Sequence, residues 1–289
     1  MSDAKTARVS PTAYATGYFW FRQGMSPAAF ATPQGRRLDR VFRVFTATTK
    51  RLSGFSLDAL MLARHKGIDA QLRKAIERGE VGQVIEIAAG LSPRGWSFMQ
   101  RYGKRLRYIE TDLPAMAATK RALLEKTGCL SDRHRVVELD ALASEGPASL
   151  AAIAATLDPK VGTAIITEGL MNYLDPDAAR GVWQRIATTL ARFPHGLYFS
   201  DVYFSERARH PAVIAFGALL SVFVKGRMHI HFDTPADVPR VMKAAGFARG
   251  RAIPCESIAE TREYAKQRGG DSVRVLEASV TPRGASRKK

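Results

Sequence analysis

The sequence lacks several features that would assign it to particular classes of protein. It has only two cysteines, Cys129 and Cys255, far apart and without a partner at metal-ligand spacing. Neither a disulfide framework nor a metal site is therefore indicated, and a reducing cytoplasmic location is expected. The N-terminus has no apolar run of signal-peptide length, and the longest apolar run, residues 212–224, is too short to span a bilayer. We therefore expect a soluble protein without a transmembrane segment.

Acidic residues are scarce relative to basic ones, which gives a formal net charge of +17. Such a charge attracts anionic partners, whether nucleic acid, acidic lipid or acidic substrates, without choosing among them. Part of the excess lies in the C-terminal residues 282–289 and part in residues 36–51. In the second segment, apolar residues at helical spacing (Leu38, Val41, Phe42, Phe45) alternate with Arg36, Arg40 and Arg43. This pattern predicts a basic amphipathic helix, which we interpret as docked on the protein's own core rather than on a membrane or RNA.

From residue 83 onward, short β-like runs alternate with helical runs. The predicted strands cover residues 83–89, 105–112, 134–140, 162–169 and 196–204, and 272–280 resembles an edge strand. Pro114, Pro147 and Pro176 stand at or near the expected helix starts, where a missing N–H costs little. Repeated strand-then-helix units favour a parallel sheet covered by helices on both faces. We therefore predict a doubly wound α/β fold with an antiparallel last strand.

The flanking segments suggest how the chain is organised into domains. Residues 1–80 are mostly helical in pattern and contain the aromatic stretch "TGYFWFRQG" (16–24), so we predict a helical cap. Residues 81–289 form the expected sheet domain, with an apolar helical insertion at 205–234.

The first predicted strand runs into a turn that is poor in glycine, "VIEIAAGLSPRG" (84–95). A loop that holds pyrophosphate needs glycines where this chain has Ala88 and Ala89, and only Gly90 and Gly95 remain. S-adenosylmethionine carries no phosphate and needs one close backbone approach, which Gly90 can provide. The loop therefore favours an S-adenosylmethionine enzyme over a nicotinamide dehydrogenase.

Three predicted strands end in a carboxylate, namely Asp112, Asp140 and Glu168. Ligands of open parallel sheets bind beyond these strand ends, so the three carboxylates would repel a phosphate and favour a cationic cofactor. Asp112 is placed to accept both ribose hydroxyls, or to cap the helix that begins at Pro114. Asp140 is placed to reach the adenine amino group, or simply flanks a helix.

Five segments together resemble the leucine carboxyl methyltransferase-like family of class I methyltransferases. They are "LARHKGIDAQL" (62–72), the 83–95 loop, "RYIETDLPAMAATKRALL" (107–124), "RVVELDAL" (135–142) and "AIITEGLMNYLDPD" (164–177). The most specific features are E-x-D-x-P with a Lys eight positions after the Asp, and T-E-G-x-x-x-Y-L. The resemblance spans roughly residues 60–200, and it implies the doubly wound, seven-stranded and mostly parallel sheet of class I methyltransferases, with an antiparallel last strand.

The resemblance implies roles for individual residues. Arg64 would bind the methionine carboxylate of S-adenosylmethionine, Glu168 would lie near its amino-acid end, and Tyr173 would lie close to the reacting methyl. The remaining cofactor contacts implied in this way are Glu86, Ala88 and Gly90 in the loop, Asp112 at the ribose, and Asp140 with Ala141 at the adenine.

This chain departs from the family loop at two positions. Ala88 replaces a usual Gly and Ser92 replaces a usual Asp, whereas Arg94 is retained. A methyl group at position 88 is tolerated well only if the backbone there does not have a positive φ.

Methyl transfer from a sulfonium is an in-line displacement, so the protein mainly positions the reactants and excludes water. A carboxylate acceptor arrives ionised, whereas a hydroxyl acceptor needs a general base. In "MHIHFD" (228–233), His229, His231 and Asp233 share one face if the segment is extended. We take His229 and His231 as a structural or substrate-contacting pair and predict no metal site.

We therefore predict an S-adenosylmethionine-dependent methyltransferase that methylates a carboxylate or hydroxyl of a small molecule. Two alternatives stay open: a methyltransferase acting on RNA or another anionic macromolecule, and a non-catalytic binding module that retains the fold. These motifs name neither the acceptor nor an oligomeric state.

Overall fold

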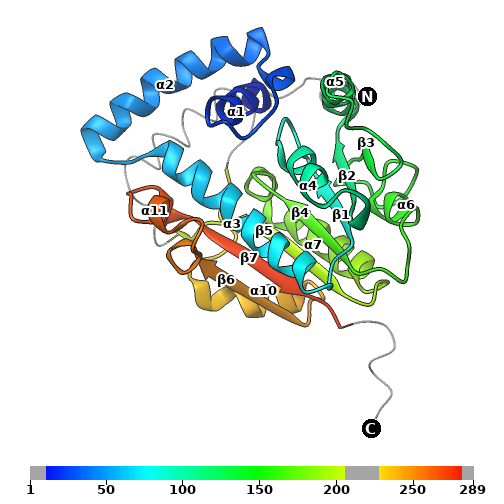
Figure 1. The fold of residues 1–289 in the computed structure, drawn as a ribbon. Helices are drawn as coiled ribbons and strands as arrows, with labels where there is room; N and C mark the ends of the chain where they lie inside the picture. The colour runs from blue at the N-terminus through cyan, green and yellow to red at the C-terminus, as the bar shows by residue number, and fades with distance from the viewer. Residues whose placement is uncertain (1–10, 206–227, 282–289) are drawn as a thin grey trace, which may run out of the picture.

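A single seven-stranded sheet forms the centre of the protein (Figure 1). The computed structural model describes residues 11–205 and 228–281. In spatial order the strands are β3 (His134–Glu138), β2 (Arg107–Asp112), β1 (Gln83–Ile87), β4 (Thr163–Thr167), β5 (Gly196–Val202), β7 (Arg274–Ser279) and β6 (Arg249–Pro254). Strands β3 to β5 are parallel, and β7 runs antiparallel to both of its neighbours. The predicted doubly wound, seven-stranded fold with an antiparallel last strand is thus confirmed.

Helices cover both faces of the sheet, and the hydrophobic core fills the two layers between them (Figure 1). On one face lie α3 (Leu57–Glu77), α4 (Arg94–Tyr102) and α5 (Pro114–Glu125), with the short α11 (Arg262–Ala265) beside α3. On the other face lie α6 (Leu150–Ala154), α7 (Pro176–Leu190) and α10 (Val238–Ala244). Alternate residues of each central strand supply the two layers, as expected for a sheet buried on both sides.

Helix starts follow the prolines in two of the three predicted cases. Pro114 begins α5 and Pro176 begins α7, where Asp175 accepts hydrogen bonds from the first-turn N–H groups. Pro147 does not begin α6, because Ser149 caps that helix and its first residue is Leu150.

The N-terminal region contributes α1 (Pro11–Arg22), α2 (Pro33–Ser53) and α3. Helices α1 and α2 pack on each other at one end of the sheet, whereas α3 packs directly against β5 and β7 (Figure 1). Most of the predicted insertion at 205–234, the apolar run 212–224 and the basic tail 282–289 lie outside the described residues. Within the described ranges, no helix is both long and apolar enough to cross a membrane.

The predicted helix at 36–51 forms as part of α2, but its expected docking face is wrong. Val41 belongs to the predicted apolar face, yet 55% of its surface is exposed. The helix packs on α1, where Gly35 lies so close to Tyr14 that a Cβ would be 2.6 Å from the Tyr14 carbonyl oxygen. This close approach turns Asp39 inward, where it is buried, and leaves Val41 on the outer side of the helix.

Candidate functional site

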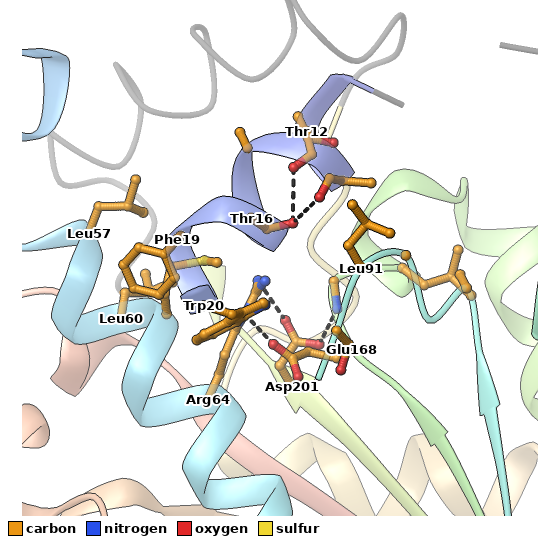
Figure 2. A pocket seen from close by; sticks show the side chains of 18 of the residues that line it. Thr12, Thr16, Phe19, Trp20, Leu57, Leu60, Arg64, Leu91, Glu168 and Asp201 are labelled. Carbon is orange, nitrogen blue, oxygen red and sulfur yellow. Dashed lines mark hydrogen bonds and ion pairs between the residues drawn. The ribbon is translucent and has the colours of Figure 1, made fainter. Parts of the chain in front are cut away.

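The order of the strands reverses between β1 and β4, since β2 and β3 follow on one side and β5 on the other. In open α/β sheets, ligands bind beyond the carboxyl ends of the strands at such a point. A cavity of about 540 Å³ lies there (Figure 2). Its floor comes from the ends of β1, β2, β4 and β5, and its walls come from α1, α2 and α3. Its volume falls in the range of roughly 300–1,000 Å³ that is typical of small-molecule sites.

Arg94 organises the buried charges beneath the cavity. Its guanidinium is fully buried and donates to Asp69 Oδ1 at 2.5 Å, Glu86 Oε1 at 2.6 Å and Glu168 Oε2 at 2.5 Å. His65 joins the cluster through Nδ1, 2.8 Å from Glu168 Oε2. By binding these three carboxylates, the Arg94 guanidinium ties the middle of α3 to the carboxyl ends of β1 and β4.

Arg64 lies beside this cluster and faces the cavity (Figure 2). Its Nε donates to Glu168 Oε1 at 3.0 Å, and its Nη1 lies 3.7 Å from Asp201 Oδ2. Among the described residues, none accepts a hydrogen bond from Nη2 of Arg64. Two cavity-lining carboxylates thus hold Arg64 in place while part of its donor set stays available to a ligand.

Carboxyl groups outnumber guanidinium groups in this part of the site. Asp69, Glu86, Glu168 and Asp201 stand against Arg64 and Arg94. Burial pushes the pKa of Glu168 upward, but His65, Arg94 and Arg64 outweigh it and hold that pKa well below its ordinary value. Burial raises the pKa of Asp201. The excess of carboxyl groups fits a ligand that brings positive charge and opposes one that brings phosphate.

The turn after β1 lies against the end of β2. Asp112 accepts hydrogen bonds from Gly90 N at 2.7 Å and from Leu113 N at 2.8 Å, and burial raises the pKa of its carboxyl group. Each carboxylate oxygen retains a further acceptor position toward the cavity. Asp112 does not cap α5, whose N-cap is Leu113 without a side-chain bond.

Ala88 has a φ of 53° and is the one non-glycine residue with positive φ in the described ranges. The condition under which a methyl group would be well tolerated there is therefore not met. The left-handed conformation costs an L-residue about 1–2 kcal/mol, so the turn carries strain that a glycine would not.

The motif E-x-D-x-P followed by Lys has a structural explanation. Glu110, Asp112 and Pro114 end β2 and begin α5, and Lys120 returns from α5 to pair with the buried Glu110. His134 Nε2 lies 2.6 Å from the other oxygen of Glu110. A Cβ on Gly95 would lie 2.4 Å from the Glu110 carboxyl carbon, so Gly95 serves this packing.

Tyr173, in the short 3-10 helix after β4 (Met171–Tyr173), lines the cavity. Burial raises the pKa of its hydroxyl, which is therefore protonated at neutral pH and suited to donate a hydrogen bond.

Seven of the sequence-predicted site residues line the cavity: Arg64, Glu86, Ala88, Gly90, Asp112, Glu168 and Tyr173. Asp140 and Ala141 do not line it. Asp140 accepts from Leu142 N, and the Ala141 carbonyl accepts from Arg185. Their predicted adenine contact is therefore not reproduced by this arrangement.

His229 and His231 also lie away from the cavity, because the opposite face of their segment, with Met228 and Ile230, lines it. His231 Nε2 lies 2.8 Å from the Met171 carbonyl oxygen, and its ring packs edge-on against Trp183. This placement of His231 fits the structural interpretation of the pair.

Sequence reasoning missed several lining residues. Asp201 ends β5 just as the predicted acids end their strands, so the same signal could have identified it. Helix α1 contributes Thr16, Phe19 and Trp20 (Figure 2). The Trp20 ring stacks on His65 with centroids 4.3 Å apart. No spacing rule links these N-terminal residues to a site formed by the sheet.

Proteins with similar sequences bear the names of S-adenosyl-L-methionine-dependent methyltransferases. A provisionally named S-adenosyl-L-methionine-dependent methyltransferase of Frankia alni is 29% identical over 197 residues, which cover 68% of this chain and 66% of that protein. Another of the same name from Mycolicibacterium gilvum is 35% identical over 118 residues, which cover 41% of this chain and 37% of that protein. The matched segments thus span from about a third to two thirds of these relatives.

Solved structures agree in fold. A provisionally named methyltransferase from Thermobifida fusca has a TM-score of 0.62 at 14% identity, and the match covers 96% of this chain and 97% of that one. The mitomycin 7-O-methyltransferase MmcR has a TM-score of 0.51 at 18% identity, covering 93% and 66% of the two chains.

The model of the leucine carboxyl methyltransferase family matches residues 27–187, more than half of the chain, and includes the cap helix α2, Arg64, Asp112 and Glu168. The chain therefore belongs to the leucine carboxyl methyltransferase family of S-adenosylmethionine-dependent methyltransferases.

Proposed function

We propose that this protein transfers the methyl group of S-adenosylmethionine to a carboxylate or hydroxyl oxygen of a small molecule. The observation that carries the proposal is the cavity itself. One end is rich in carboxylates and lies at the reversal of strand order, and the other end is apolar and lies under the cap. The first end fits a cationic nucleoside, and the second fits the body of an acceptor.

At the cofactor end, Asp112 would accept hydrogen bonds from the ribose hydroxyls beside Gly90. Arg64 would bind the amino-acid carboxylate through its free Nη2, and Glu168 with Asp201 would bind the ammonium group. When bound, the cofactor supplies an electrophilic methyl on its sulfonium. In this scheme the residues of the protein bind and orient, and they need not accept a proton.

At the acceptor end, apolar side chains of the cap and of the segment after residue 227 form the walls, including Phe19, Trp20, Phe42, Met61 and Met228. They would exclude water from the reacting atoms. Tyr173 would donate a hydrogen bond that orients the acceptor oxygen. Since no histidine lines the cavity among the described residues, an acceptor that arrives ionised, such as a carboxylate, suits it best.

Helices α1 and α2 line the cavity on the side opposite the sheet. This covering supports a small acceptor over a folded RNA, whose methylated atom would have to pass beneath two helices.

Calorimetric titration with S-adenosylmethionine tests the cofactor end. We expect Asp112→Asn to weaken binding about tenfold or more, because a hydrogen bond to a charged group contributes roughly 1.5–3 kcal/mol. Asp158→Asn is the matched control, since Asp158 is exposed and its carboxylate accepts a hydrogen bond only from Lys160 N, whereas its bonds to Gln83 come from the main chain. Absence of binding by folded protein would support the non-catalytic alternative, and equal loss in both variants would remove the role of Asp112.

Transfer of a labelled methyl group tests the reaction itself. Apolar carboxylic acids and phenols are incubated with protein and labelled cofactor, and the products are identified by mass spectrometry. We expect an acid to be labelled, with the product losing its label on mild alkaline hydrolysis as a methyl ester does. Labelling confined to RNA would contradict the proposal.

A further inference from the structure

The outer face of α2 is unusual for a surface helix because large apolar side chains lie open on it. Among the side chains that the structure describes, four large apolar ones are exposed, and three of them belong to α2: Val41 at 55%, Val44 at 71% and Leu52 at 81%. With about 3.6 residues per turn, positions 41, 44 and 52 fall on one side of the helix. They line one side of the helix, with the exposed Thr48 between Val44 and Leu52.

The same outer face is basic. Arg37, Arg40 and Arg51 are exposed beside or among its apolar residues. The single acidic residue of α2, Asp39, is buried on the opposite side, beside Arg22. At the C-terminal end of the helix, Arg268 donates to the Ser53 carbonyl and adds a further cation. The outer face thus combines open apolar groups with positive charge and carries no negative charge.

We propose that the outer face of α2 is a docking surface for an anionic lipid bilayer. A helix lying in the headgroup region buries apolar side chains at the acyl boundary while its arginines pair with lipid phosphates. A second copy of the chain would bring basic side chains against basic side chains. A nucleic acid backbone would pair with the arginines but would leave Val44 and Leu52 in water. The membrane satisfies both properties of the face together.

The position of α2 gives the docking a consequence. Its inner side lines the cavity through Asp39, Phe42 and Arg43, and Figure 1 shows the helix along the outer edge of the molecule. A bilayer on the outer face would therefore lie one helix diameter from the cavity, next to the apolar acceptor end. The inference rests on the surface of α2 alone and does not depend on the proposed methyl transfer.

Co-sedimentation of the full chain with lipid vesicles tests the proposal without cofactor or acceptor. We expect binding to vesicles of phosphatidylcholine mixed with phosphatidylglycerol, and at least tenfold weaker binding to phosphatidylcholine alone. The double variant Val44→Ser with Leu52→Ser should bind about tenfold more weakly. Arg40→Gln should lose about fivefold, from the roughly 1 kcal/mol per cation near an anionic surface.

Controls use the same substitutions elsewhere. Leu142→Ser changes the fourth exposed apolar residue, 51% exposed and outside α2, and Arg180→Gln removes an exposed cation from α7. Neither should change vesicle binding, and all variants should keep the parent melting temperature because the residues are exposed. Equal binding to neutral vesicles, full binding by the double variant, or a loss in Arg180→Gln as large as that in Arg40→Gln would overturn the proposal. So would a dimer that the double variant abolishes.

Discussion

Replacing Arg94 by lysine tests whether the charge cluster holds the site together. Lysine keeps the positive charge but loses the planar fork that reaches Asp69, Glu86 and Glu168 at 2.5–2.6 Å. One ammonium group cannot take the place of all three bonds, so carboxylates are left buried without a partner. Breaking a buried ion pair costs about 3–5 kcal/mol. For a domain of this size, that corresponds to a fall in Tm of about 6–20 °C.

Scanning calorimetry or dye-based melting measures this shift. The matched control is Arg180→Lys, where arginine donates to Asp177 in a pair whose side chains are 60% and 89% exposed. An exposed pair contributes at most about 1 kcal/mol, so its Tm should change by no more than about 2–4 °C. If Arg94→Lys shifts the Tm no more than Arg180→Lys does, the cluster does not stabilise the fold and the reasoning is refuted.

The same variant should change how the stability of the fold decreases at acid pH. Because the pKa of Glu168 is held well below its unfolded value of about 4.3, the group contributes stability above that pH and loses it as pH falls through the folded pKa. Arg94 is one cause of the depressed pKa. Acid unfolding of Arg94→Lys, followed by circular dichroism, should therefore begin at a higher pH than in the parent.

Three further predictions concern residues around the site. Burial lowers the pKa of His134, but its neighbours Cys129 and Glu110 outweigh this effect and raise the pKa to about 9. The contribution of His134 to folding stability is therefore fully present below its unfolded pKa of about 6.5, and it is lost as the pH rises through 9. In chemical denaturation, the parent should lose on the order of 3 kcal/mol of stability as the pH rises through this range, and His134→Gln should remove most of that loss. An unchanged loss would contradict the assignment. Ala88→Gly should leave the Tm within about 2 °C or raise it, because relief of the left-handed strain offsets the added chain entropy, whereas a clear fall would show that the strain is absent. Gly67→Ala should destabilise the protein despite its better helix propensity, because the new Cβ would lie 2.6 Å from Val275 Cγ2. Gly181→Ala should stabilise the protein by up to about 1 kcal/mol, because its new Cβ would meet only the flexible end of the Arg185 side chain. A change of stability with the same sign in both variants would contradict this packing argument.

The sequence predicted the parallel part of the sheet because those strands are short buried runs separated by helical patterns. Strand β6 (Arg249–Pro254) escaped notice, since it is an edge strand that is nowhere fully buried and carries two arginines. The motif residues Arg64, Asp112 and Glu168 were found because each sits at a strand end or in a recognisable segment. The strand order that brings these residues to one cavity was not predicted, because an alternating pattern indicates a parallel sheet without giving the order of its strands.

What could not be predicted depended on distant contacts. Arg94 was noticed only as a loop residue, because its partners Asp69 and Glu168 lie 25 and 74 positions away in the sequence. In residues 228–233, the two histidines alternate with Met228 and Ile230, but this alternation does not state which set of side chains faces the cavity. In the structure, Met228 and Ile230 face it. The docking of α2 was mispredicted for the same reason, since amphipathic spacing gives a face but not its partner.

Strand β7 has a consequence for how the molecule forms during synthesis. It lies between β5 and β6, and it also packs under α3, the helix that carries Arg64, some 200 positions earlier in the chain. While the ribosome is still making residues 249–273, β6 has no neighbour to pair with and α3 lacks part of its support. Contacts of such long sequence separation form late. Cofactor binding by nascent chains of increasing length should therefore begin only once β7 has left the exit tunnel.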